Sequence, residues 1–166
     1  MKKNLLLFAF SFFIYSGFSQ NMNTEKMGEV FKIVADSIQG AKGQWRFKIK
    51  KVVFMCVTDI KHNRMRIISP IAEAKQIDEK LKSAALIANF HSALDVKYAI
   101  SDDILWSVFI HPLKELSEAQ LKDAIKQVYS ANITFGTTFS STDLVFPGSQ
   151  RKEETKKEKK LLKKEY

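Results

Sequence analysis

The chain of 166 residues contains only one cysteine and three histidines. A single cysteine cannot form an internal disulfide, so the hydrophobic core has to stabilise the fold alone. Cys56 lies in an apolar run and is interpreted as a small buried residue, the alternative being a reactive thiol. No Cys-x-x-Cys or His-x-x-x-His spacing occurs, and the histidines are scattered over positions 62, 91 and 111. Because structural metal sites cluster their ligands, we expect no metal and no cofactor.

Motifs of catalysis are also missing. Neither a Gly-x-Ser-x-Gly nucleophile elbow nor a glycine-rich phosphate loop occurs in the sequence. Ser107, His111 and Asp102 contain the residue types of a catalytic triad, but Ser107 falls in the middle of a predicted strand, where we expect it to point outward. Asp102 and Asp103 are interpreted as turn residues rather than as paired catalytic carboxylates, since aspartates hydrogen-bond locally in turns. We therefore expect no catalytic residues.

The first 19 residues have the pattern of a secretory signal. Two lysines precede an apolar run of 14 residues from Leu5 to Phe18, which is too short to span a bilayer as a helix. Small residues at positions 17 and 19 predict cleavage before Gln20. We expect an exported protein, periplasmic or secreted, with no transmembrane segment after cleavage. The alternative is an uncleaved N-terminal anchor.

The net charge of +9 is unevenly distributed along the chain. Two lysines lie in the predicted signal, and residues 151–166 hold eight Lys or Arg against four Glu. Residues 20–150 keep 17 basic and 14 acidic side chains, a net charge of +3. We interpret residues 20–150 as one domain. Residues 151–166 are expected to be a charged, disordered or partly helical tail, because they lack the apolar residues of a core.

Hydrophobic periodicity predicts three helices in the domain. The first is expected over residues 24–39, with Gly40 as its stop. The second is expected to begin between residues 71 and 75 and to end near residue 90. The third is expected over residues 118–135, because Ser117 and Gln120 have the spacing of a capping box.

Alternating apolar residues predict antiparallel strands between these helices. One strand, or two strands joined at Lys50-Lys51, is expected over residues 43–57, and another over residues 64–69 that ends at Pro70. A hairpin is expected over residues 96–110, around the turn Ser101-Asp102-Asp103. The predicted fold class is α+β, with an antiparallel sheet and the order helix, two or three strands, helix, two strands, helix.

The predicted strands place basic residues on one face of the sheet. Apolar residues at positions 45, 47 and 49 alternate with cations. The basic patch consists of Arg46, Lys48, Lys50, Arg64 and Arg66. Such a patch would attract an acidic protein, a lipopolysaccharide-like surface or nucleic acid. The simpler interpretation is a solvated face that stays soluble through its charge, and the export signal argues against nucleic acid.

Large apolar side chains are the candidates for contact with a partner. Tryptophan is over-represented in binding sites, although Trp45 and Trp106 lie in apolar strands where core packing also accounts for them. The run from Ser83 to Ala88 in the second helix is apolar nearly all round, which predicts burial against the sheet or a partner. The candidate partner-binding residues are Trp45, Phe47, Leu86, Ile87 and Trp106.

The second helix also predicts a homodimer. If one of its sides packs on the sheet, the other side has to meet the last helix or a second copy of the chain. An exposed helix surface that is this apolar usually marks an interface. The competing interpretation is that residues 137–146 fold back and cover this surface within one chain.

Three segments give the chain a resemblance to a known family. They are Leu86 to Phe90, the hairpin from Lys97 to Phe109, and Pro112-Leu113 followed by Leu116-Ser117. In this order they resemble the segment that links the middle and last helices of the class I chaperones of type III secretion, the Tir-chaperone-like superfamily, whose YbjN-like relatives share the fold. The resemblance covers residues 27–135. It implies a homodimer that binds an extended segment of another protein along apolar patches of its helices and sheet.

The sequence as a whole favours an exported, non-catalytic protein-binding module. Its expected partners are another protein or peptide segment and a second copy of the chain. Two alternatives stay open at this point. One is a small envelope enzyme with a site assembled from distant residues, and the other is an envelope-surface binder that acts through basic residues.

Overall fold

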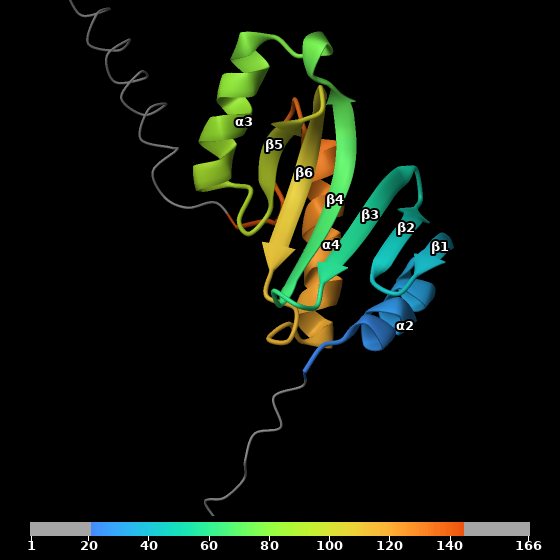
Figure 1. The fold of residues 1–166 in the computed structure, drawn as a ribbon. Coiled ribbons are helices and arrows are strands. Elements are labelled where there is room, and N and C mark those ends of the chain that lie inside the picture. Colours follow the sequence, from blue (N-terminus) through green and yellow to red (C-terminus); the bar gives the residue numbers. More distant parts are fainter. Residues whose placement is uncertain (1–20, 145–166) are drawn as a thin grey trace, which may run out of the picture.

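A six-stranded antiparallel sheet forms the centre of the protein (Figure 1). The computed structural model describes residues 21–144, so the predicted signal peptide and the charged tail lie outside the described residues. The strands lie side by side in the order β1-β2-β3-β4-β6-β5. They are β1 (Ser37–Ala41), β2 (Gln44–Ile49), β3 (Val52–Asp59), β4 (Arg64–Glu73), β5 (Lys97–Ser101) and β6 (Ile104–His111).

Within residues 21–144, three α-helices accompany the sheet. They are α2 (Thr24–Val34), α3 (Glu79–His91) and α4 (Glu118–Thr134), and the short 3-10 helix η2 (Ala74–Gln76) precedes α3. The observed order is helix, four strands, helix, two strands, helix. The predicted α+β class with an antiparallel sheet is therefore confirmed. Four strands precede α3, whereas two or three were expected there.

Elements with strong local signals form where the sequence predicts them. At the start of α4, the Ser117 hydroxyl accepts a hydrogen bond from the Gln120 N–H at 3.1 Å, and the Gln120 side chain accepts one from the Ser117 N–H at 2.9 Å. The β5–β6 hairpin turns at Asp102 and Asp103, both of which have positive φ. Lys50 also has a positive φ of 53°, so β2 and β3 are two strands joined by a tight turn.

The expected helix over residues 24–39 is wrong over its last five residues. α2 ends at Val34, and the chain continues as β1, an edge strand paired with β2. The Asp36 carboxylate accepts a hydrogen bond from the Lys50 N–H at 2.5 Å and ties the start of this strand to the β2–β3 turn. Gly40 has a φ of 100°, but it lies within β1 rather than at a helix end. Pairing with β2 outweighs the helical spacing of this segment. Ile38, which fits that spacing, also reaches the core as an inward-facing residue of β1.

The expected strand end at Pro70 and the expected start of the second helix are also wrong. β4 continues to Glu73, and its register with β6 shifts between Pro70 and Ala72. A bulge tolerates proline because the missing N–H is not needed there. α3 begins only after Asp78, whose side chain accepts a hydrogen bond from the Leu81 N–H at 2.7 Å.

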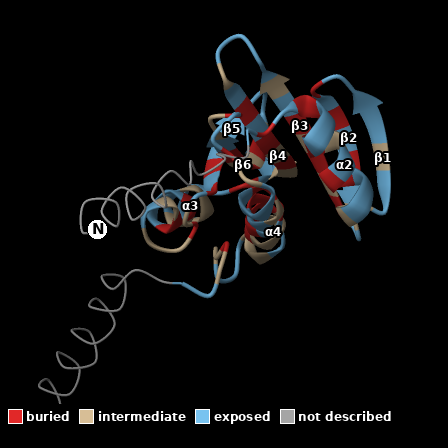
Figure 2. Cartoon of the chain, turned by 90° about the horizontal axis from the view of Figure 1, so that it is seen from below, coloured by how far each residue is buried: buried red, intermediate tan, exposed pale blue. Residues whose placement is uncertain are grey.

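One face of the sheet carries the core. Aromatic rings join α2 to this face, since Phe31 stacks on Phe47 with centroids 4.6 Å apart and Phe47 stacks on Phe54 at 4.9 Å. α4 covers the middle of the same face over β4 and β6 (Figure 2). Ser107 is fully buried beneath α4, where its hydroxyl donates to the Val128 carbonyl at 3.3 Å. The outward position expected for Ser107 is therefore wrong.

Candidate functional surfaces

α3 is attached to the edge of the sheet and leaves most of its surface free. Ala85 and Ala88 are its buried residues, and it packs beside β5. The Asn89 side chain accepts a hydrogen bond from the Tyr98 N–H at 2.7 Å and donates one to the Tyr98 carbonyl at 3.1 Å. Asn89 thus occupies the backbone groups of edge strand β5 that another strand would use.

Three large apolar side chains lie exposed on α3. Leu86 is 68% exposed, Ile87 is 60% exposed and Phe90 is 78% exposed. Residues separated by three or four positions share one side of a helix, so these side chains form a continuous patch, which we call the α3 face. An exposed apolar surface of this kind marks an interaction site more often than an isolated exposed leucine does.

Residues 137–143 fold back beside α3 but do not cover this face. The Ser92 hydroxyl donates to the Phe139 carbonyl at 2.7 Å, and the Ser141 N–H donates to the Ser92 carbonyl at 3.1 Å. The returning segment borders a groove of about 670 Å³ between α3 and α4. The Nδ1 atom of His91, which lines this groove, is buried and has no hydrogen-bond partner among the described residues. Val145 and Phe146, part of the competing interpretation, lie outside the described residues.

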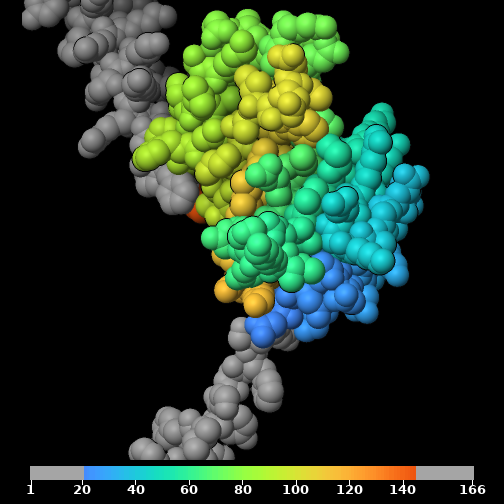
Figure 3. Space-filling view, viewed as in Figure 1, coloured from blue at the N-terminus to red at the C-terminus, as the bar shows by residue number. Residues whose placement is uncertain are grey.

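The second candidate surface is the face of the sheet opposite α2 and α4. No helix within residues 21–144 lies over it, and the space-filling view shows the strands themselves forming this side of the molecule (Figure 3). Strand alternation gives the side chains that point to this face. We call it the outer sheet face and define it by the following residues: Arg46, Lys48, Val53, Met55, Val57, Arg64, Arg66, Ile68, Trp106, Val108 and Ile110.

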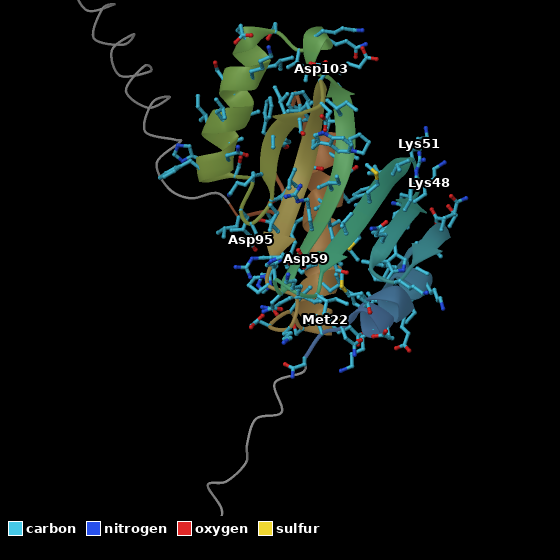
Figure 4. All side chains as sticks on the ribbon, viewed as in Figure 1. Met22, Lys48, Lys51, Asp59, Asp95 and Asp103 are labelled. Atoms are coloured by element: carbon cyan, nitrogen blue, oxygen red, sulfur yellow. The ribbon has the colours of Figure 1, made fainter. Side chains whose placement is uncertain are left out.

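Four of the five residues of the predicted basic patch lie on the outer sheet face. Arg46 and Lys48 come from β2, and Arg64 and Arg66 come from β4. All four are exposed. Lys50 differs because it lies in the β2–β3 turn, where its ammonium group is 5.9 Å from the centre of the Tyr129 ring on α4. Figure 4 shows Lys48 and Lys51 near this turn and Asp59 at the opposite end of β3.

The predicted partner-binding residues divide into two groups. Trp45 and Phe47 are buried between the sheet and α2, so their side chains are not available to a partner. Trp106 lies half-buried on the outer sheet face, and its indole N–H donates to the Ser101 carbonyl at 3.1 Å. Leu86 and Ile87 belong to the α3 face. Of the five predicted partner-binding residues, Leu86, Ile87 and Trp106 are accessible to a partner. Phe90 joins them because it belongs to the exposed α3 face.

Neither the candidate triad nor a metal-ligand cluster is assembled within residues 21–144. The imagined triad is not connected, because the Ser107 hydroxyl bonds to main-chain carbonyls while His111 Nδ1 lies 2.8 Å from the Pro112 carbonyl. No group of three or more metal-ligating side chains occurs within residues 21–144. Burial raises the pKa of the Cys56 thiol far above its ordinary value, which disfavours the reactive thiolate. The lowered pKa of Asp59 arises first from its hydrogen bond with the His62 side chain, and both side chains are exposed.

Comparison with solved structures identifies the fold. The chain matches no protein-family model and none of the curated proteins. Its fold is similar to that of SchA in the HopA1-SchA chaperone-effector complex, with a TM-score of 0.52 and 13% identity, covering 68% of this chain and 88% of that chain. It is also similar to the Yersinia pestis type III secretion chaperone SycH, solved in complex with a stable fragment of YscM2. There the TM-score is 0.53 and the identity 16%, covering 69% of this chain and 100% of that chain.

These comparisons confirm the predicted chaperone-like fold. At identities of 13% and 16% they concern the fold alone. None of the helices between residues 21 and 144 combines the length and apolar character that crossing a membrane requires.

Proposed function

We propose that this protein is an exported, non-catalytic module that binds an extended segment of another polypeptide and works as a homodimer. The α3 face is proposed to pair the two copies, and the outer sheet face is proposed to receive the segment. The likeness to two chaperones, each solved with another protein, supports a role in protein binding.

One observation carries this proposal. Leu86, Ile87 and Phe90 are each at least 60% exposed, although the domain has ample apolar residues for its own core. Burying a side chain of this size contributes about 1.5–3 kcal/mol, so a partner that covers all three gains several kcal/mol. The outer sheet face adds further apolar side chains, of which Val57 and Ile110 are 47% and 54% exposed.

Site-specific photocross-linking in the native host tests both surfaces. A photoreactive amino acid at Leu86 should yield an adduct of two copies of this chain. The same amino acid at Val57 should yield an adduct with a different polypeptide. Glu25 on α2 is the control position and should yield neither. Absence of any adduct at Leu86 and Val57 would contradict the proposal.

Export has its own test. If the signal is cleaved as expected, the protein isolated from the native host begins at Gln20. Mass spectrometry of the N-terminal peptide decides this, and an intact Met1 would show that cleavage does not occur.

A further inference from the structure

We infer that the outer sheet face selects an acidic partner segment, one in which carboxylates alternate with or flank apolar side chains. This inference rests on the proposed function, because it names the chemistry of the segment that the face would receive. The observation behind it is the arrangement of cations and apolar residues across β2, β3, β4 and β6.

The cations of this face form no ion pair with a carboxylate among the described residues, although Arg64 is the cross-strand neighbour of Asp59. Arg46, Lys48 and Arg66 take part in none of the four ion pairs between residues 21 and 144. Asp59 is the carboxylate at the end of this face, and it is held by His62 with 2.6 Å between Oδ2 and Nδ1. Within residues 21–144 the positive charge of this face is therefore left largely unpaired, and a complementary partner would be steered to it.

Apolar side chains lie between these cations in a fixed register. Arg66 stands directly between Val57 on β3 and Ile110 on β6, the two most exposed apolar residues of the face. Arg46 lies beside Met55, which in turn pairs with Ile68. Since neighbouring strands are about 4.8 Å apart, Arg46 and Arg66 are separated by roughly 10 Å or slightly more, with apolar surface between them.

This mixture fits a polypeptide better than other anionic partners. Single-stranded nucleic acid is bound by exposed aromatic platforms, whereas Trp106 is the aromatic residue of this face and its indole N–H is already bonded to the Ser101 carbonyl. An anionic membrane surface attracts cations but rewards apolar groups that protrude, such as tryptophan and phenylalanine. Val53, Met55, Ile68 and Val108 are only half-exposed and form shallow apolar contacts between the cations. A chain that alternates carboxylates with apolar side chains satisfies both features.

Fluorescence anisotropy with labelled synthetic peptides tests the inference. The probe is a short peptide of glutamate, leucine and serine, and its matched control has glutamine in place of every glutamate. The mature protein should bind the glutamate peptide at least about tenfold more tightly than the glutamine peptide at low ionic strength. Raising the salt concentration should reduce this preference, because exposed charges are screened.

Charge-reversal variants show whether the face is responsible. The double variant Arg46→Glu and Arg66→Glu should lose about tenfold or more in affinity for the glutamate peptide. The double variant Lys32→Glu and Lys126→Glu changes the net charge equally at exposed positions on α2 and α4, and it should lose less than about twofold. Circular dichroism and thermal unfolding verify that both variants remain folded.

Each other outcome overturns the inference. Equal binding of the two peptides would mean that the face does not select acidic segments, although the proposed function would stand. Equal loss in the two double variants would mean that net charge rather than this face attracts the peptide. No binding of the glutamate peptide, or tighter binding to phosphatidylglycerol vesicles or to a single-stranded oligonucleotide, would assign the cations to another partner or to none.

Discussion

Two buried serines, Ser69 and Ser107, let α4 lie directly against the sheet. Both side chains are fully buried. The Ser69 hydroxyl donates to the Val53 carbonyl at 2.7 Å and accepts from the Asn132 amide of α4 at 2.9 Å. The hydrogen bonds of Ser107 are longer, at 3.3 and 3.4 Å. Small size is therefore the more important property of Ser107, and hydrogen bonding that of Ser69.

This difference gives a prediction for Ser107. Ser107→Val adds a branched side chain beneath α4, and overpacking of this kind costs about 1–3 kcal/mol of unfolding free energy. Ser107→Ala keeps the space free and should cost less than half as much, because the hydrogen bonds that it removes are long. Urea denaturation of both variants measures the difference. A larger loss for the alanine variant would mean that the hydroxyl, not its size, matters.

Single residues also mark the limits of sequence reasoning about the surface. Alternation assigned Arg46 and Lys48 to the outer side of the sheet, and they lie there. The same pattern could not separate Lys50 from them, because a positive φ in the turn directs it toward Tyr129. Nor could it reveal that Trp45 and Phe47 face α2, since which side a helix covers depends on tertiary packing.

Whole elements were predictable where their signals are local. The capping box of α4 and the aspartate turn between β5 and β6 each lie within four residues of the chain, and both elements form as expected. β1 was missed although β2 follows it directly after the two-residue turn Lys42-Gly43, because the helical spacing extends from Val34 to Ile38. The second half of β4 was missed because it pairs with β6, a strand that follows only after α3 and β5. Propensity and spacing give no information about such pairing.

The α4 cap yields the prediction at this scale. Ser117→Ala removes the acceptor for the Gln120 N–H and should lower the free energy of unfolding by about 1 kcal/mol. Ser117→Asp restores an acceptor and should recover most of the loss. Thermal or urea unfolding of the two variants checks this. An unchanged stability in Ser117→Ala would indicate that water replaces the cap.

α3 illustrates how an element can be predicted while its environment is not. Its apolar character is evident in the sequence. The sequence did not decide whether this apolar surface is buried against the sheet or against a partner. In the structure only Ala85 and Ala88 are buried, and the largest apolar residues point away from the sheet. The helix is thus fixed to the edge by small residues and by Asn89, while its large residues remain free for another molecule.

At the scale of the whole molecule, the stability of the folded domain is expected not to depend on the charged tail, residues 151–166. Deleting Arg151 to Tyr166 should change the free energy of unfolding by less than about 1 kcal/mol, because the segment offers little apolar surface to bury. Urea denaturation of the full mature chain and of the shortened chain makes the comparison. A substantially larger loss would mean that the tail docks, and Leu161-Leu162 is the pair that would do so.

The pairing of two copies through the α3 face is the claim on which the proposed function depends most. If two copies associate through this face, the fraction of dimer rises with protein concentration and falls when the apolar residues of the face are replaced. Leu86→Glu or Ile87→Glu introduces a charge at its centre and should dissociate the dimer, or unfold it if single copies are not stable. Ile33→Glu is the matched control, because Ile33 is 73% exposed but lies on α2.

Light scattering coupled to size-exclusion chromatography of the mature protein tests this claim most directly. At tens of micromolar, the unmodified protein and Ile33→Glu should have the mass of two chains. Leu86→Glu should have the mass of one chain or be lost through unfolding. If the unmodified protein has the mass of a single chain under these conditions, the α3 face does not pair two copies.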